Sequence, residues 1–479
     1  MTVTDQRSRR VARRQAGPGR LRSTSREVDP IDPIAVFAAA SARGLEAALW
    51  LQPAADRSIV GVGRAWAVEE GGGDRFEASA HAWRSLLADG LVSSERRGPT
   101  EGGPILLGGL GFTGRTPEAD DPWAAFGSAS LVLPSLTVRR DGPASTLAIA
   151  TTMGLGSDAD PGELERLWDA LAGDADADAD RASAPDVTGH PATSTTWPAR
   201  RSVAVERPDR AEWDRTVGMF AGAVGRGRID KVVLARRVTY RAPGDLDVIA
   251  ALRHLAASAP ESTTFAFVRD GTAFLGATPE RLVQTRGRSF ETVAIAGSAP
   301  RGSDPAEDAR LARLLLASEK EREEHAVVVD TLRAGLSPIV ETLQVADSPA
   351  ILPLRHVQHL VTPITGTLRD EAGLLSLGGR LHPTPAVGGA PRELALELIA
   401  DQEGFDRGWY AGPIGWLGAD GDGELMVALR CGLVTGPEAI LFAGCGIVAD
   451  SDPAREWEES RLKLRTMTTA LGGLAVGDR

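Results

Sequence analysis

The sequence predicts an α/β protein, because short apolar segments punctuated by glycine alternate with stretches that have helical periodicity. Of its 479 residues, 42% are apolar and 25% are charged, which is typical of a soluble globular protein with an ample core. A chain of this length forms two to three domains or one large α/β unit. The formal net charge of −12 argues against nucleic acid as a partner, since phosphate contacts require a basic surface.

The N-terminal part divides into three predicted regions. Residues 1–32 hold eight arginines, few apolar residues and no hydrophobic signal-peptide region, which predicts a disordered basic tail. Residues 33–172 begin the folded part, with helices expected at 35–40, 78–88 and 161–171 and strands at 58–63, 105–112 and 129–134. Residues 173–199, an Asp-Ala repeat followed by a Pro/Ser/Thr-rich run, predict an acidic linker or surface loop.

The C-terminal region, residues 200–470, gives sharper signals. A long helix is expected over 305–334, where Asp304 is the cap and Pro305 occupies the first turn. Another helix is expected after Asp452-Pro453, and residues 420–423 predict a hairpin turn. Strands are expected at 231–239, 264–269, 272–276, 281–285, 289–296, 414–417, 425–434 and 439–443.

Two observations bear on the cellular location. Cys431 and Cys445 form neither a disulfide framework nor a zinc-ligand spacing, which predicts a protein of the reducing cytoplasm. No apolar run approaches the roughly 18 residues of a membrane helix, so we expect no membrane partner.

Lysine is rare in this chain, and one of its lysines occupies an unusual position. Among 53 basic residues only Lys231, Lys320 and Lys463 are lysines, so a retained lysine suggests a position that requires an amine. Lys231 opens the apolar run 231–235, which predicts a strand that enters the core. The residue is therefore either a general base or an amphipathic side chain at a strand end.

Glu280 is the second candidate for acid–base chemistry. It follows a predicted strand and a proline turn, and it precedes the apolar Leu282. A carboxyl group between apolar segments is expected to have a raised pKa, which a general acid requires. The alternative is an ordinary ion pair with Arg281 or another cation.

Two predicted helices carry carboxylates that are suited to a metal ion. Glu324 and His325 end a charged run and lead directly into an apolar one, so this end of the run enters a core. Glu459 and Lys463 lie four residues apart on one helix face and could hold a metal and a substrate carboxylate side by side. Carboxylate oxygens suit Mg²⁺, although exposed salt bridges explain both runs equally well. The glycines around Cys445, Gly444 and Gly446, are a weak indication of an anion site.

Eight motifs follow one another in the chain. They are 231–236 (KVVLAR), 274–282 (FLGATPERL), 296–298 (AGS), 316–320 (LASEK), 382–389 (HPTPAVGG), 430–431 (RC), 443–447 (AGCGI) and 456–459 (EWEE). The series resembles the chorismate-utilising enzymes, most closely the isochorismate synthases of menaquinone and siderophore pathways. The resemblance is strong over roughly residues 205–470 and looser over 33–170.

The resemblance implies a single catalytic unit of the α/β (α+β) class, in which large, mostly antiparallel sheets are packed with outer helices. It also implies a monomeric isomerase that converts chorismate to isochorismate with Mg²⁺, by adding water at ring carbon 2 with loss of the hydroxyl at carbon 4. Lys231 matches the family's general base and Glu280 its general acid, while Glu324 and Glu459 match the magnesium ligands. The positions that match substrate contacts are Arg430, Gly444, Gly446, Lys463, His382, Thr384, Ala386, Gly297 and Ser298.

Two comparisons within the resemblance favour an isochorismate synthase. Anthranilate and aminodeoxychorismate synthases use ammonia and generally lack a lysine at the position of Lys231. Salicylate synthases keep that lysine but usually lack the version of the motif found at 382–386. The alternatives that stay open are a salicylate synthase, which also eliminates pyruvate, and a non-catalytic chorismate-binding regulator.

Overall fold

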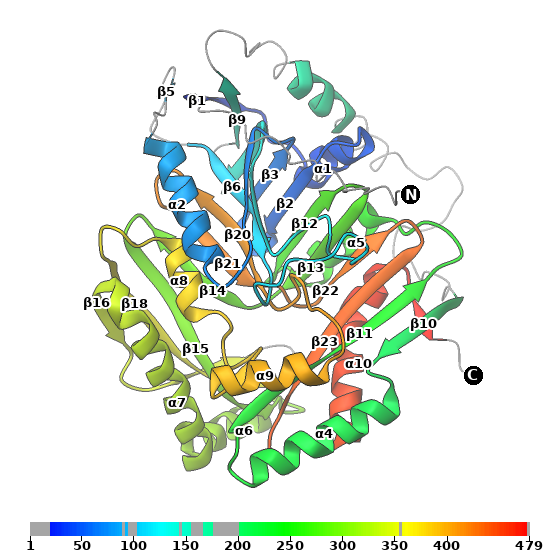
Figure 1. Ribbon diagram of the computed structural model, residues 1–479, viewed down its shortest axis with the longest axis vertical. Coiled ribbons are helices and arrows are strands. Elements are labelled where there is room, and N and C mark those ends of the chain that lie inside the picture. Colours follow the sequence, from blue (N-terminus) through cyan, green and yellow to red (C-terminus); the bar gives the residue numbers. More distant parts are fainter. Residues whose placement is uncertain are drawn as a thin grey trace, which may run out of the picture.

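The protein is built from two large β-sheets that face each other, with helices on their outer sides (Figure 1). The computed structural model describes residues 20–88, 92–93, 103–142, 146–154, 166–175, 201–353 and 357–476. Among the described strands all neighbours pair antiparallel except β1 with β5 and β10 with β24. This arrangement confirms the expected α/β class with mostly antiparallel sheets.

The first sheet has 14 strands and draws on both halves of the chain. Its order is β24 (Ala475–Val476), β10 (Arg201–Arg207), β11 (Lys231–Arg241), β23 (Glu438–Ile447), β22 (Cys431–Thr435), β13 (Thr272–Thr278), β12 (Thr263–Arg269), β2 (Ala47–Gln52), β3 (Arg57–Val62), β8 (Leu136–Asp141), β9 (Thr146–Gly154), β1 (Arg20–Val28) and β5 (Val92–Ser93), with β19 (Gly389–Ala390) beside β11.

The second sheet has 10 strands and also mixes the two halves. Its order is β16 (Val340–Val345), β18 (Val357–Leu368), β15 (Ser289–Pro300), β14 (Arg281–Arg286), β21 (Gly423–Val427), β20 (Pro413–Gly418), β6 (Ile105–Leu110), β7 (Ala129–Leu133) and β4 (Trp66–Glu69), with β17 (Ala350–Pro353) beside β18. Because residues 33–172 and 200–470 share both sheets, they form one unit.

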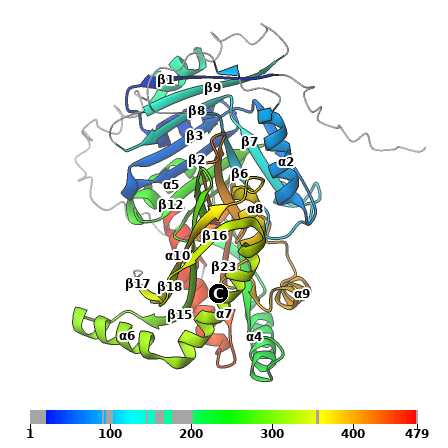
Figure 2. The ribbon, with the colours of Figure 1, turned by 90° about the vertical axis from the view of Figure 1, so that its left-hand side faces the viewer.

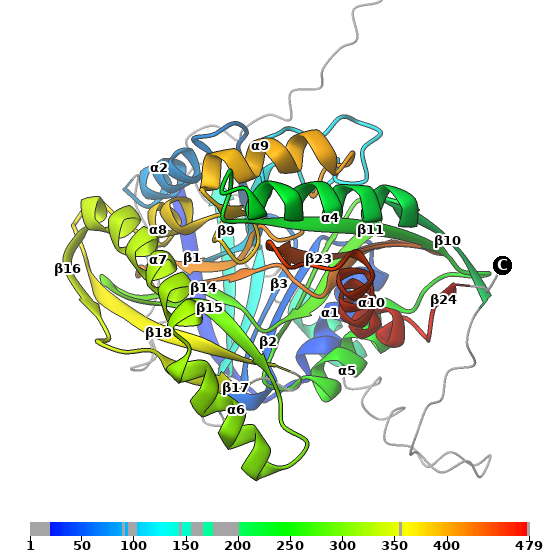
Figure 3. The ribbon, with the colours of Figure 1, turned by 90° about the horizontal axis from the view of Figure 1, so that it is seen from below.

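Helices cover the sheets in two groups. The first sheet contacts α1 (Pro33–Ala42), α4 (Arg210–Gly225), α5 (Val248–Ser258), α9 (Arg392–Gln402) and α10 (Pro453–Ala470). The second sheet contacts α2 (Arg75–Ala88), α6 (Pro305–Ala317), α7 (Glu319–Leu336) and α8 (Leu374–Leu381). Figure 2 shows α6 and α7 beneath β15 and β18, and Figure 3 shows α10 beside β23. Short 3₁₀ turns occupy Pro53–Ala55 and Ser337–Ile339. None of the described helices is long and apolar enough to cross a membrane.

The largest core lies between the two sheets and is rich in aromatic side chains. Phe274 of the first sheet meets Trp123, Phe126 and Trp409, with ring centroids between 5.1 and 6.1 Å apart, and Phe265 lies 5.4 Å from Phe274. Such edge and tilted contacts add to the free energy of burying apolar area. This core fixes how the two sheets face each other, and the candidate site depends on that arrangement.

Two predicted boundaries of the N-terminal part differ from the structure. The tail predicted over 1–32 extends too far, because residues 20–28 form β1, pair with β9 along their whole length and bury Leu21. The linker predicted from 173 begins too early, because a helix spans 166–175 and Asp174 pairs with Arg43. A distant partner supplied each contact, which local composition does not reveal. Residues 1–19 and 176–200 lie outside the described part.

The helix predicted over 305–334 is two helices. Ser318 leaves the helical conformation, and its side chain accepts a hydrogen bond from the backbone N–H of Glu321, so it begins a new helix. Likewise the strand predicted over 425–434 is interrupted, because Arg430 has a left-handed φ of 48°. Both breaks lie near residues of the candidate site.

Candidate active site

Two crossovers between the sheets form the centre of the site. Glu280 lies where the chain leaves β13 of the first sheet and enters β14 of the second, and Arg430 lies where the chain returns from β21 to β22. The crossovers are tied together, since the amide of Ala277 donates to the Arg430 carbonyl at 3.2 Å and the amide of Val427 donates to the Glu280 carbonyl at 2.9 Å. The Thr278 hydroxyl also donates to the Val427 carbonyl at 2.5 Å. The backbone thus holds both functional groups side by side.

The carboxyl group of Glu280 is adapted to donate a proton near neutral pH. Burial raises its pKa to about 7, and the opposing charges of Lys231 and Lys463 limit the rise. The side chain nevertheless keeps partial access to solvent, because it lines a pocket. A carboxyl group that is about half protonated at pH 7 can act as a general acid. Arg281, the cation of the alternative ion pair, has Glu424 as its partner at 2.7 Å.

Lys231 begins β11 as expected, and its partly exposed side chain extends along the neighbouring strand β23. A Cβ atom built at Gly446 would lie 2.6 Å from Cε of Lys231, so the glycine leaves space for the lysine stem. The lack of a side chain at Gly446 therefore allows the Lys231 side chain to take this position. Since both lysines act on Glu280, the predicted base and acid share one electrostatic environment.

Lys463 and Glu459 lie on the same face of α10, as their spacing predicts, and their charged atoms are 2.6 Å apart. The ammonium group of Lys463 also donates to the carbonyl of Gly444 at 2.8 Å. This bond places the ammonium group of Lys463 against β23 at Gly444. The glycine segment thus orients a cation through a carbonyl, in addition to any role of its amides.

The carboxylates form one close group, which differs from the predicted pair. Ligand atoms of Glu456, Glu459 and Cys445 lie within 4.8 Å of one another. Burial and the neighbouring charge of Glu459 raise the pKa of Glu456, so a bound cation would relieve this repulsion. Burial also raises the pKa of Cys445, so its protonated thiol is a poor ligand for a hard cation. Glu324 lies on α7, partly exposed, and is not a member of this group.

Helix α7 is fixed to the second sheet by His325. This buried histidine contacts the carbonyl of Ala296 at 3.1 Å through Nδ1 and the hydroxyl of Thr362 at 2.7 Å through Nε2. This anchor holds the part of α7 that carries Glu321 and Glu324, the helix that packs against β15. His325 itself has no free ring nitrogen for a metal.

Ser298 meets two residues that sequence patterns did not indicate. A bulge at Gly297, whose φ is 76°, directs the Ser298 amide to the Glu321 carboxylate at 3.2 Å. Its hydroxyl lies 2.8 Å from Nδ1 of His359, which is its cross-strand partner. Burial lowers the pKa of His359, and the charges of Lys231 and Lys463 lower it further, so His359 shares the environment of both lysines.

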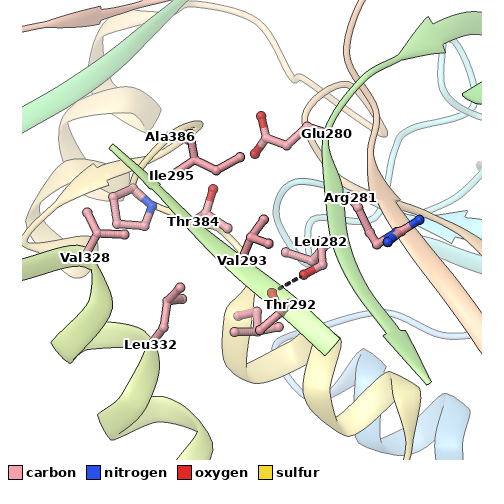
Figure 4. Close-up of a pocket in the computed structure, with 12 residues that line it drawn as sticks. Glu280, Arg281, Leu282, Thr292, Val293, Ile295, Val328, Leu332, Thr384 and Ala386 are labelled. Carbon is pink, nitrogen blue, oxygen red and sulfur yellow. Dashed lines mark hydrogen bonds between the residues drawn. The ribbon is translucent and has the colours of Figure 1, made fainter. Parts of the chain in front are cut away.

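A pocket of about 400 Å³ opens beside Glu280. In Figure 4 the Glu280 carboxylate faces Ala386 and Ile295, while Thr384 lies on the adjacent wall. Val328 and Leu332 of α7 close the apolar side. Thr384 and Ala386 thus line the pocket beside Glu280.

His382 occupies a different position from the one predicted. Its side chain is buried, and Nε2 donates to the carbonyl of Phe112 at 2.9 Å, so it anchors the loop and does not line the pocket. Burial lowers the pKa of His382 to about 3, which keeps the ring neutral. Because a neutral imidazole cannot attract an anion by charge, its place in the substrate site is corrected to that of a loop anchor.

The loop is joined to β11 by a buried ion pair that the sequence analysis missed. Arg407 donates to the Val387 carbonyl and to the Val233 carbonyl, each at 2.8 Å. Its partner Glu403 accepts from the amide of Ala235 at 2.8 Å. Both side chains are 2% exposed. The pair therefore connects the pocket loop to the strand that begins with Lys231, and the i,i+4 spacing of two charges beside apolar residues was the only local signal.

We expect Glu403→Gln to lower the free energy of unfolding by about 3–5 kcal/mol, because it leaves the buried Arg407 cation without a counter-charge. Asp214→Asn is the matched control, since Asp214 forms an exposed i,i+4 pair with Arg210. Such a pair contributes about 0.5 kcal/mol. Urea unfolding followed by tryptophan fluorescence measures both effects. Equal shifts of the two midpoints would show that the buried pair has no special role.

Comparisons with known proteins show the family to which the chain belongs. Residues 6–472 match the family described as chorismate binding enzyme. The salicylate biosynthesis isochorismate synthase of Pseudomonas aeruginosa is 40% identical over 95% of this chain and 90% of that protein. The isochorismate synthase MenF of Bacillus subtilis is 32% identical over 95% and 94%. The solved structure of MenF, the menaquinone-specific isochorismate synthase from Escherichia coli, covers 95% of each chain with a TM-score of 0.71 and 27% identity. The chain therefore belongs to the chorismate-binding enzyme family.

Proposed function

We propose that this chain is an isochorismate synthase, a magnesium-dependent isomerase that converts chorismate to isochorismate. The observation that carries the proposal is that the Glu280 carboxyl group has a raised pKa and lies close enough to Lys231 for the lysine charge to act on it. A base and an acid are what the reaction requires, because one proton is removed from an entering water and one is given to a leaving hydroxyl. The names of the two similar curated proteins support the same activity.

Lys231 acts as the general base. Its amine takes a proton from a water molecule whose oxygen forms a bond to ring carbon 2. The double bonds of the ring shift, and the bond from carbon 4 to its hydroxyl oxygen breaks. Glu280 gives its proton to that oxygen, which leaves as water. One water enters and one leaves, so the product is an isomer of the substrate.

The cations of the site bind the two carboxylates of chorismate. Arg430 and Lys463 supply the protein's positive charge, and the backbone of Gly444 and Gly446 borders the same space. Thr384, Ala386, Gly297 and Ser298 supply the remaining contacts. Preorganised charges of this kind stabilise a developing anion more than water does, since they need no reorientation during the reaction.

Magnesium fits the carboxylates of this site. Glu459 and Glu456 on α10 would hold it, together with Glu324 on α7, because carboxylate oxygens are the donors that Mg²⁺ prefers. When bound, the ion neutralises a substrate carboxylate and polarises the ring. Lys463 contacts Glu459 at 2.6 Å, so a cation held by Glu459 would compete with this ion pair.

The pH dependence of turnover tests the acid. We expect kcat/KM to fall as the pH rises through about 7, because Glu280 then loses the proton that it must donate. Glu280→Gln should lower turnover by about 10² to 10⁴ and should abolish this alkaline limb. An alkaline limb that persists unchanged in the glutamine variant would assign it to another group.

Product analysis tests the activity itself. Incubation with chorismate and Mg²⁺ should give isochorismate in a mixture with chorismate, without ammonia and without pyruvate. Chromatography and a lactate-dehydrogenase assay for pyruvate measure the two outcomes. Stoichiometric pyruvate with salicylate would make this chain a salicylate synthase, and the absence of any conversion would favour the non-catalytic regulator.

A further inference from the structure

The motif 231–236 contributes only Lys231 to the proposed reaction, although it ends in a buried arginine. Arg236 lies on β11, and its side chain is 0% exposed. Successive side chains of a strand project from opposite faces, so Arg236 and Lys231 lie on opposite faces of β11. Arg236 faces α4 and α10, which pack against each other and against the first sheet (Figure 3). Because it has no exposed surface, Arg236 does not contact a ligand itself.

The guanidinium group of Arg236 contacts three side chains. One terminal nitrogen, Nη1, donates to the hydroxyl of Ser460 at 2.6 Å, and Nη2 lies 3.1 Å from the carboxylate of Glu206 on β10. The guanidinium carbon lies 3.2 Å from the ring centroid of Trp457. A cation over the face of an indole ring is attracted to it, most strongly where water is excluded. Arg236 thus binds α10 by a hydrogen bond and by stacking, while Glu206 supplies the counter-charge.

The two contacts on α10 alternate with the carboxylates of the candidate metal site. Trp457 follows Glu456 in the chain, and Ser460 follows Glu459. The Ser460 hydroxyl, which accepts from Arg236, donates to the Trp457 carbonyl at 2.6 Å. Residues three apart lie on one face of a helix. Contacts at 457 and 460 therefore fix the rotation of this part of α10, and with it the directions of the two carboxylates.

Two further bonds hold the first turn of the same helix. The indole N–H of Trp213 donates to the Pro453 carbonyl at 3.1 Å, and the Cys445 thiol donates to the Glu456 carbonyl at 3.2 Å. Both bonds reach backbone groups at the start of α10. The contact of Arg236 with Ser460 lies one turn further along the helix, so it holds the part that carries Glu459.

We propose that Arg236 is a positioning residue of the metal site, which holds α10 so that Glu456 and Glu459 stay close enough to share one cation. The proposal rests on the proposed function, since it takes these two carboxylates as ligands of Mg²⁺. Their ligand atoms lie within 4.8 Å of each other, although their like charges repel. An ion that had to bring the carboxylates together would bind more weakly, because the cost of ordering them would be taken from the free energy of binding.

Calorimetric titration of the full chain with Mg²⁺ tests the role of Arg236. Arg236→Met keeps a long side chain against Trp457 but removes the bond to Ser460, and it should raise the Kd for Mg²⁺ by about 10- to 100-fold. Ser460→Ala removes only the hydroxyl and should raise this Kd by about fivefold.

Arg269→Met is the matched control. Arg269 is also a buried arginine of the first sheet, 5% exposed, with its guanidinium carbon 5.2 Å from the ring centroid of Trp409. It lies on β12, which two strands separate from β23, the strand against which α10 packs. Its replacement should leave the Kd for Mg²⁺ unchanged, even where it destabilises the fold.

Hydrogen exchange of the metal-free chain measures the position of the helix without the ion. Amides of residues 457–463 should exchange at least about tenfold faster in Arg236→Met than in the unchanged chain. In Arg269→Met the exchange of these amides should be unaltered. Equal rates in the two variants would show that other contacts hold this part of α10, and they would overturn the proposal.

The Mg²⁺ titration separates the role of Arg236 from the proposed function. If the unchanged chain binds no Mg²⁺, the proposed metal site is wrong and the positioning role is wrong with it. If the unchanged chain binds Mg²⁺ and folded Arg236→Met binds it equally well, only the positioning role is wrong, and Arg236 merely stabilises the fold. If Arg236→Met does not fold, unaltered Mg²⁺ affinity in Ser460→Ala overturns the proposal.

Discussion

Replacement of Lys231 by alanine is expected to lower kcat by about 10² to 10⁴ while chorismate still binds, because the variant removes the base but leaves Arg430 and Lys463 in place. Lys231→Arg should be nearly as inactive, since a guanidinium group does not give up its proton in this pH range. The arginine is also larger, and the space beside Gly446 is fitted to a lysine stem. Steady-state kinetics with chorismate gives kcat, and titration of the inactive variant gives the affinity.

Lys320→Ala is the matched control, since Lys320 is an exposed lysine on α7 and the proposed reaction gives it no role. Its kcat should equal that of the unchanged chain. Near-normal turnover in Lys231→Arg would contradict the assignment of the base. Loss of chorismate affinity equal to the loss of kcat in Lys231→Ala would instead give the lysine a binding role.

The second large effect is expected at the metal site. Glu459→Gln and Glu456→Gln should each raise the Mg²⁺ concentration needed for activity by about tenfold or more, because each removes an anionic ligand. Glu324→Gln tests the contribution of α7 in the same way. Calorimetric titration with Mg²⁺ measures binding directly, so the result does not depend on turnover.

Glu458→Gln is the control for the metal site. Glu458 lies on the same helix but is 63% exposed and pairs with Arg461 at 3.2 Å. It should leave the affinity for Mg²⁺ unchanged. If Glu459→Gln binds the ion as tightly as the unchanged chain, the carboxylate pair on α10 is not its site.

Much of the fold was predictable from local patterns. The predicted strands over 231–239 and 439–443 correspond to β11 and β23, and the predicted start of a helix at Asp452-Pro453 is confirmed by α10. These patterns are local, since they rest on apolar periodicity and on capping residues. The break at Ser318 was not expected, because the periodicity of the charged run continues through it. The membership of β1 in a sheet required its partner β9, which lies more than one hundred residues away in the chain.

The residues of the candidate site were likewise predictable only where their sequence signal is local. Lys231 and Glu280 were recognisable because each lies at the edge of an apolar strand, and the structure brings them into one electrostatic environment. His359 was not recognisable, since only the register of β15 and β18 brings it to Ser298. Glu403 and Arg407 were missed because their role is to bind backbone groups that lie far away in the sequence. Local motifs thus indicate the candidate acid and base, whereas the residues that hold them in place depend on contacts between distant parts of the chain.

The most direct test of the account is the origin of the new hydroxyl oxygen. Chorismate is incubated in ¹⁸O-labelled water, and mass spectrometry of the first isochorismate formed locates the label. We expect one ¹⁸O atom at ring carbon 2 in each product molecule, because Lys231 activates water and Glu280 protonates the hydroxyl that leaves from carbon 4. Unlabelled isochorismate from early turnovers would mean that the hydroxyl moves directly between the two carbons, and it would contradict both roles.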